Sequence, residues 1–164
     1  MKHVYLAGFD VFRADAVEHG RYLKELCARH GLQGVYPFDH AAPDAPTLAE
    51  KARAICRLNM RAVRGSDAVL ANLNPFRGHE PDSGTVFEVG MAAALDIPVW
   101  AYFAPAGSLR DQVPHDALGF DENGLQVEDF GLPRNLMLAC SWAGASDTVE
   151  KAVADLAACL RRQP

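Results

Sequence analysis

Short apolar runs alternate with longer segments of helical periodicity along this chain. Apolar runs of about four to eight residues closed by Gly, Pro or Asp are typical of buried strands, whereas apolar residues that recur about every three to four positions are typical of helices. The patterns predict strands over 3–7, 34–38, 67–73 and 97–103, and helices over 15–30, 47–64, 85–95 and 147–162. Residues 131–142 are expected to form a short helical turn with a brief strand.

This alternation predicts an α/β fold, because parallel strands are joined by crossovers that are usually helices. We expect one domain over residues 1–164, a doubly wound, flavodoxin- or Rossmann-like parallel sheet of about five strands with helices on both faces. Ligands of such sheets bind outside the carboxyl ends of the strands, so loops 8–12, 37–40 and 74–84 are of interest. Residues 104–127 are polar and too long for a simple connector, which indicates a lid or a subunit contact whose role stays open.

Composition and charge narrow the class of protein. Hydrophobic residues make up 49% and charged residues 23%, a balance that supports a globular core. The net charge of -5 disfavours a nucleic-acid partner, because phosphate binding relies on clustered Lys and Arg. No apolar stretch approaches the roughly 18 residues of a membrane span, and the short apolar N-terminus does not fit a signal sequence. We therefore expect a cytoplasmic protein without a membrane partner.

The spacing of cysteine and histidine predicts no metal site. The cysteines at 27, 56, 140 and 159 show no C-x-x-C spacing, and the six histidines form no H-x-x-x-H pair. Zinc sites and disulfide frameworks depend on such spacings. Reduced structural thiols, no metal and no cofactor are therefore expected.

Glu88 is the strongest candidate for chemistry. The sequence places it in the first turn of a helix that is otherwise apolar nearly all round and therefore buried. A buried carboxylate costs several kcal/mol unless it is paired or opens onto a polar cavity, and a helix N-terminus favours its ionised form by about 0.3 to 1 kcal/mol. The alternative is structural, because Thr85 to Glu88 also spells a capping box.

Asp82 precedes Glu88 by six residues and adds a second carboxylate near the same helix N-terminus. Cleavage of an N-glycosidic bond needs such a pair, since one oxygen traps the sugar carbon while an acid protonates the departing base. A loop or cap acid is the alternative for Asp82.

Three segments carry a resemblance to a known family. YLAG, DAVLANLNPFRGHEPDSGTVFEVGMAAAL and GLPRNLML closely resemble the nucleoside 2-deoxyribosyltransferases, most of all a subgroup with a PFRG-x-EPD-x-GT loop, over nearly the whole chain. The resemblance implies a ping-pong exchange on a deoxynucleoside and a free nucleobase. In that exchange Glu88 forms a glycosyl ester with retained configuration, and Asp82 protonates the leaving base.

The same resemblance implies a homo-oligomer and a set of substrate-binding residues. Asn135 matches an asparagine that completes the neighbouring subunit's site at the sugar 5′-hydroxyl, with a helix cap as the alternative. Asn59 stands where many relatives carry Asp; its amide can bind Glu88 or a sugar hydroxyl but cannot titrate, and a surface Asn is the alternative. Gly84 and Met137 lie in the matched motifs and complete this part of the expected set.

The first loop is expected to hold the base. Tyr5, Gly8, Phe9 and Phe12 are assigned to it, where relatives stack the base and let the backbone approach it, although aromatic residues at this spacing also fit a core. Phe9 replaces a proline expected in close relatives. Asp39 can pair with a base edge or act as a turn acid.

Two other functions remain open. A nucleosidase or nucleoside 5′-monophosphate hydrolase would use water in place of the acceptor base, with Arg77 and Arg134 as the only obvious groups for a phosphate. A non-catalytic flavodoxin-like module that binds a nucleotide or a protein would have the same sheet. Resemblance to the subgroup favours purines as the exchanged bases.

Overall fold

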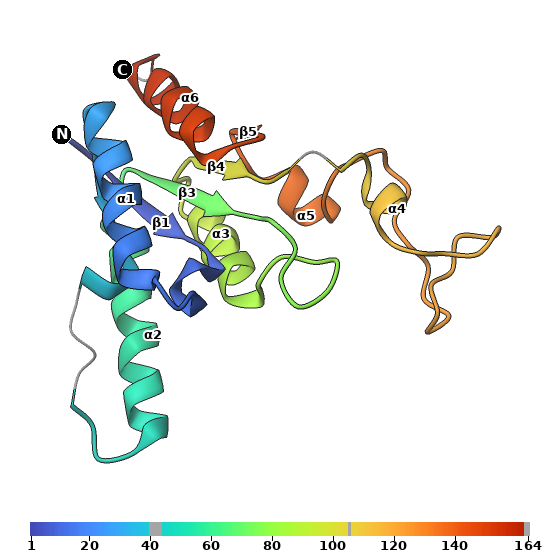
Figure 1. Ribbon diagram of the computed structural model, residues 1–164, viewed down its shortest axis with the longest axis horizontal. Helices are drawn as coiled ribbons and strands as arrows, with labels where there is room; N and C mark the ends of the chain where they lie inside the picture. The colour runs from blue at the N-terminus through green and yellow to red at the C-terminus, as the bar shows by residue number, and fades with distance from the viewer. Residues whose placement is uncertain (40–43, 105, 163–164) are drawn as a thin grey trace.

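The computed structural model describes residues 1–39, 44–104 and 106–162, so His40 of the second loop lies outside the described residues. Five parallel strands form one sheet in the order β2-β1-β3-β4-β5 (Figure 1). The strands are β1 (Lys2–Ala7), β2 (Leu32–Val35), β3 (Ala68–Asn72), β4 (Val99–Tyr102) and β5 (Gly144–Ser146). The chain adds β2 on one side of β1 and β3 on the other, so the strand order reverses beside β1. Ligands of such sheets bind at that point.

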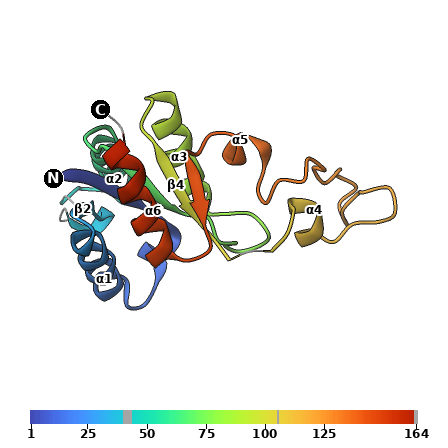
Figure 2. The ribbon, with the colours of Figure 1, turned by 90° about the horizontal axis from the view of Figure 1, so that it is seen from above.

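Helices cover both faces of the sheet, and the doubly wound α/β fold is confirmed (Figure 2). The helices are α1 (Ala16–Arg29) and α6 (Val149–Arg162) on one face and α2 (Leu48–Arg64) and α3 (Ser83–Ala94) on the other. Alternation along β1 divides the core, because Val4 and Leu6 pack toward α1 and α6 while Tyr5 and Ala7 pack toward α3. In the described residues no helix is both long and apolar enough to cross a membrane.

Short elements occupy the carboxyl edge and a projecting segment. They are the turns η1 (Phe9–Phe12) and η2 (Pro37–Asp39) and the helices α4 (Leu109–Gln112) and α5 (Leu136–Ala139). Residues 106–133, which we call the arm, extend away from the sheet (Figure 1). Arg134 fixes the root of the arm: its Nε donates to the Leu73 carbonyl at 2.8 Å, and its guanidinium lies 4.4 Å from the centre of the Phe103 ring.

Several element boundaries differ from the sequence prediction. The second strand is Leu32–Val35 rather than 34–38, because Pro37 has no N–H for the ladder and starts the turn η2. Helix α3 begins at Ser83 rather than at 85, since the Asp82 side chain accepts from the Thr85 N–H at 2.9 Å and caps it. The brief strand expected within 131–142 lies later, at Gly144–Ser146.

Candidate active site

Glu88 lies where β1, α2 and α3 meet. The Tyr5 hydroxyl donates to Glu88 Oε1 at 2.6 Å from the middle of β1, where the tyrosine is fully buried. The Asn59 side chain, on α2, faces the same carboxylate. Glu88 itself is half-buried, so its carboxylate is neither fully solvated nor sealed inside the core.

The pKa of Glu88 is raised to about 7, chiefly by burial and further by the negative charge of Asp82. Hydrogen bonding from Tyr5 and Asn59 acts in the opposite direction. The prediction that Glu88 lies in the first turn was wrong, because α3 begins at Ser83 and Glu88 is in its second turn, where the helix dipole acts more weakly. At neutral pH the carboxylate is therefore divided between its neutral and ionised forms.

Glu88→Gln should increase stability at alkaline pH. The pKa of Glu88 is raised from 4.5 to about 7 in the folded protein, so the cost of ionising it is absent below about 4.5, grows as the pH rises to about 7 and is complete above that. We expect roughly 1–3 kcal/mol more unfolding free energy at about pH 8, with the difference shrinking toward pH 4.5. Thermal denaturation across this range tests it, with the exposed Glu25→Gln as control. Equal unfolding free energies of wild type and Glu88→Gln at pH 8 would refute the claim that ionised Glu88 destabilises the folded protein.

The capping box proposed for Glu88 is not formed. Asp82 is the N-cap of α3 and its Oδ2 accepts from both the N–H and the hydroxyl of Thr85, at 2.9 and 3.1 Å. Thr85 lies inside the helix, and Glu88 bonds to Tyr5 instead of to a cap amide. The cap interpretation of Asp82 is thus correct, and it coexists with an electrostatic effect of Asp82 on Glu88. Gly84, exposed in the first turn, leaves room for the Asp82 carboxylate, which a Cβ at Gly84 would approach to 3.0 Å.

The helix α3 is less buried than its apolar sequence suggested. Phe87 and Leu95 are 56% and 44% exposed, so one side of the helix and its end face outward. Thr85, Val89 and Ala92 form the buried side. The apolar residues of α3 therefore form two surfaces: one packs on the sheet, and the other is exposed.

Only part of the set assigned to the first loop lies there. Tyr5 is within β1, so its assignment to the loop was wrong, whereas Gly8, Phe9 and Phe12 do follow the strand. Phe9 and Phe12 both stack on Phe76 of the 74–84 loop, with ring centres 5.0 and 5.4 Å apart. Phe12 remains 61% exposed, so part of its surface is open to a ligand.

Two other expected residues have local roles. Asp39 pairs with Lys24 and accepts from the Tyr36 N–H at 2.9 Å, as a turn acid does. Asn135 caps α5, accepting from the Met137 N–H at 3.0 Å, and its amide donates to Glu128 at 2.6 Å. These contacts match the alternatives given for Asp39 and Asn135.

Asn135 and Met137 border a cavity of about 470 Å³ that Val86 and Gly90 of α3 also line. At about 100° per residue, Glu88 projects from the opposite side of that helix. Within one chain, the structure therefore does not bring Asn135 and Met137 to Glu88.

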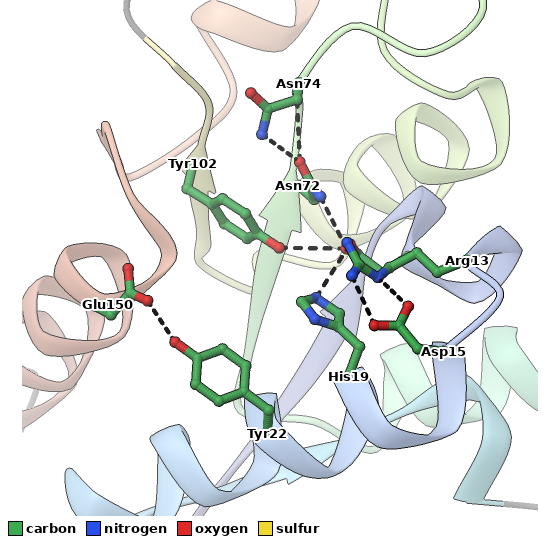
Figure 3. Close-up of polar contacts among 9 residues, drawn as sticks. Arg13, Asp15, His19, Tyr22, Asn72, Asn74, Tyr102 and Glu150 are labelled. Carbon is green, nitrogen blue, oxygen red and sulfur yellow. Dashed lines mark hydrogen bonds and ion pairs between the residues drawn. The ribbon is translucent and has the colours of Figure 1, made fainter.

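The sequence reasoning missed a buried polar cluster behind the first loop. Asp10 accepts hydrogen bonds from Asn72 and Tyr102 and lies 3.3 Å from His19. Figure 3 shows the side chains of Asn72, Tyr102 and His19 pointing toward one common position. It also missed Phe76, although the PFRG motif contains it. The available signal for Asp10 was an acid within the first loop, two residues after Gly8. Its neighbours Phe9 and Val11 form no recognisable functional motif with it.

Comparison with known proteins now decides the family. The chain matches the nucleoside 2-deoxyribosyltransferase family over residues 4–137, which is most of its length. The chain belongs to that family. Within it, a 2-desoxiribosyltransferase from Leishmania mexicana has a similar structure, with a TM-score of 0.82, 31% identity and coverage of 96% of this chain and 98% of the other.

Two further proteins are similar to this chain. A 2-deoxyribosyltransferase from Bacillus psychrosaccharolyticus gives a TM-score of 0.62 at 16% identity, covering 92% of this chain and 90% of the other, which supports the shared fold. An uncharacterized protein of Schizosaccharomyces pombe is 35% identical over 156 residues, which are 82% of this chain and 74% of that protein. The five-stranded sheet with its covering helices thus matches the fold of a 2-desoxiribosyltransferase.

Proposed function

We propose that this chain is a nucleoside 2-deoxyribosyltransferase that exchanges the base of 2′-deoxynucleosides through a covalent deoxyribosyl-Glu88 intermediate. The observation that carries the proposal is Glu88 itself, a half-buried carboxylate with a pKa of about 7 that is held by Tyr5 on this family's fold. A structural acid would gain nothing from such an environment, whereas a nucleophile needs a desolvated, partly ionised oxygen.

The exchange proceeds in two displacements at the anomeric carbon. The reactive form has Glu88 ionised and a proton on Asp82. With Oε1 held by Tyr5, Glu88 Oε2 attacks C1′; the bond from C1′ to the base nitrogen breaks, and Asp82 gives that proton to the departing base and is left ionised. An incoming base then attacks C1′ from the side that the first base left, expels the Glu88 carboxylate and returns a proton to Asp82. Two inversions retain the configuration.

The remaining groups would bind the substrate. We assign the base to the exposed face of Phe12, beside Phe9 and Gly8, and the sugar to Asn59. Asn135 and Met137 lie on the far side of α3 from Glu88, so they would serve the site of a second copy, which makes the proposed enzyme a homo-oligomer. We place it in the PFRG-loop subgroup, acting on purines in cytoplasmic nucleoside salvage.

The position of Arg134 disfavours a nucleoside monophosphate as the substrate. Its side chain is 1% exposed and donates to the Leu73 carbonyl and to Gln112, so it is not free to receive a phosphate. Arg77 lies over the Phe76 ring, 4.6 Å from its centre. Arg77 is exposed, so the preference for an unphosphorylated deoxynucleoside rests on the burial of Arg134.

Incubation of the protein with deoxyinosine and free adenine tests this function. Formation of deoxyadenosine supports transfer. Free deoxyribose as the main product identifies a hydrolase, and recovery of both reactants unchanged contradicts an enzyme of either kind.

Tyr5→Phe should move the acid limb of the pH profile upward. The Tyr5 hydroxyl lowers the pKa of Glu88, so its loss raises that pKa above about 7 and leaves less nucleophile at neutral pH. We expect kcat/KM at pH 7 to fall about tenfold and to recover in part at pH 8 to 9. Steady-state rates from pH 5 to 9 measure the shift of the acid limb. An acid limb at the wild-type position would show that Tyr5 does not set the pKa of the nucleophile.

A further inference from the structure

Asp10 is a buried carboxylate with partners from three elements behind the first loop. It is 5% exposed and is the buried residue of the turn η1. Its Oδ2 accepts from Asn72 Nδ2 at 2.9 Å and from the Tyr102 hydroxyl at 3.4 Å, and its Oδ1 lies 3.3 Å from His19 Nε2. Burying a carboxylate is costly without such partners, so these contacts hold the turn at a defined place.

Asn72 and Asn74 extend these contacts into a row of hydrogen bonds. Asn72 Oδ1 accepts from the backbone N–H and the side-chain amide of Asn74, at 3.2 and 2.7 Å. Asn74 Oδ1 accepts from the Ala104 N–H at 2.9 Å. Each amide in the row donates toward Asp10, an arrangement in which successive hydrogen bonds strengthen one another. The row thereby connects the loops that follow β1, β3 and β4.

Two of the three loops joined by this row, those after β1 and β3, also carry the aromatic residues. Phe9 and Phe12 come from the loop after β1, and Phe76 comes from the loop after β3. Gly8 backs directly onto the row, since a Cβ there would lie 2.7 Å from Asp10 Oδ2 and 2.9 Å from the Asn72 Cβ. A shift of either loop would therefore break the row and separate the rings together.

The Asp10 cluster is separate from Glu88. His19 and Tyr102 belong to the side of the sheet covered by α1 and α6, whereas Tyr5 packs on the side of α3. A change at Asp10 can therefore alter the base-binding loop without touching the nucleophile.

We propose that Asp10 is a positioning residue which, through Asn72 and Asn74, fixes the first loop against the 74–84 loop and so sets the aromatic surface that holds the nucleobase. This inference rests on the proposed function for its substrate. It assigns Asp10 no contact with that substrate.

A charge-swap cycle tests the row. Asn72→Asp keeps the side-chain size but places two carboxylates where a 2.9 Å hydrogen bond existed, so the row breaks at its centre. Adding Asp10→Asn restores a donor and an acceptor with the direction reversed, and the Asn74 bonds to residue 72 are kept. Asn74→Ala, at the half-buried end of the row, is a milder variant that leaves the buried pair intact in case Asn72→Asp does not fold.

For Asn72→Asp we expect the KM for the deoxynucleoside to rise about tenfold while kcat changes by less than about threefold, with recovery of KM in the double variant. Asn74→Ala should raise KM by about threefold. A role in folding alone would instead lower the apparent kcat at constant KM. A lower kcat at constant KM would overturn the proposal. A double variant that folds but does not recover the wild-type KM would also overturn it.

Limited proteolysis tests the anchoring without any assay of activity. Arg77 is an exposed tryptic site in the 74–84 loop, and its cleavage should be several-fold faster in Asn72→Asp and return to the wild-type rate in the double variant. Circular dichroism establishes that each variant is folded before its cleavage rate is compared with that of the wild type. An unchanged cleavage rate in Asn72→Asp would overturn the anchoring role. If cleavage is faster in Asn72→Asp but the wild-type protein exchanges no bases, the anchoring role stands and the proposed function is rejected.

Discussion

Glu88→Ala is expected to reduce base exchange by at least about 10⁴-fold, because the covalent intermediate has no other oxygen to form on. The fold should survive, since the neighbouring positions of α3 that pack on the sheet, Val89 and Ala92, are unchanged. The substitution leaves the buried Tyr5 hydroxyl without its partner, a cost that removal of the buried charge offsets in part at neutral pH.

The measurement is the initial rate of deoxyadenosine formation from deoxyinosine and adenine, with circular dichroism to establish folding. Glu25→Ala is the matched control, because Glu25 is an exposed acid of α1 on the opposite face of the sheet. Exchange by Glu88→Ala within about tenfold of wild type would exclude Glu88 as the nucleophile.

Asp82→Asn is expected to lower kcat by about 10²- to 10³-fold, because an amide can cap the helix but cannot deliver a proton to the leaving base. Asn is as good an N-cap as Asp, so the contacts with Thr85 should persist and folding should be little changed. Loss of the negative charge should also lower the pKa of Glu88 and move the acid limb of the profile downward.

Two readouts separate these effects for Asp82. Rates should fall least for a nucleoside whose base departs without protonation, and the pH profile should shift in the direction opposite to that for Tyr5→Phe. A variant with wild-type kcat on deoxyinosine would exclude Asp82 as the acid, whatever happened to the profile.

The sequence was sufficient for the sheet because apolar runs and helical periodicity recur in a regular order. It also made Glu88 the leading candidate for the nucleophile, since a single acid among apolar residues is visible in the sequence itself. The helix boundary was harder, because Thr85 and Asp82 are both good caps and only the hydrogen bond from the Thr85 N–H distinguishes them.

Long-range partners could not be read from the pattern. Glu88 and Tyr5 are 83 residues apart, and Tyr5 was assigned to the base-binding loop although it lies within the predicted strand and is central to β1. Asp10 depends on Asn72 and Tyr102, which are 62 and 92 residues away. Such contacts follow from strand order, which periodicity does not determine.

The central claim is tested most directly by intact mass of the wild-type protein after incubation with a slowly turned-over deoxynucleoside analogue. The account predicts a mass increase of one sugar residue, located on the peptide that contains Glu88, and its loss as a new nucleoside when free adenine is added. Base exchange without any such adduct, or with the sugar on another residue, would contradict it.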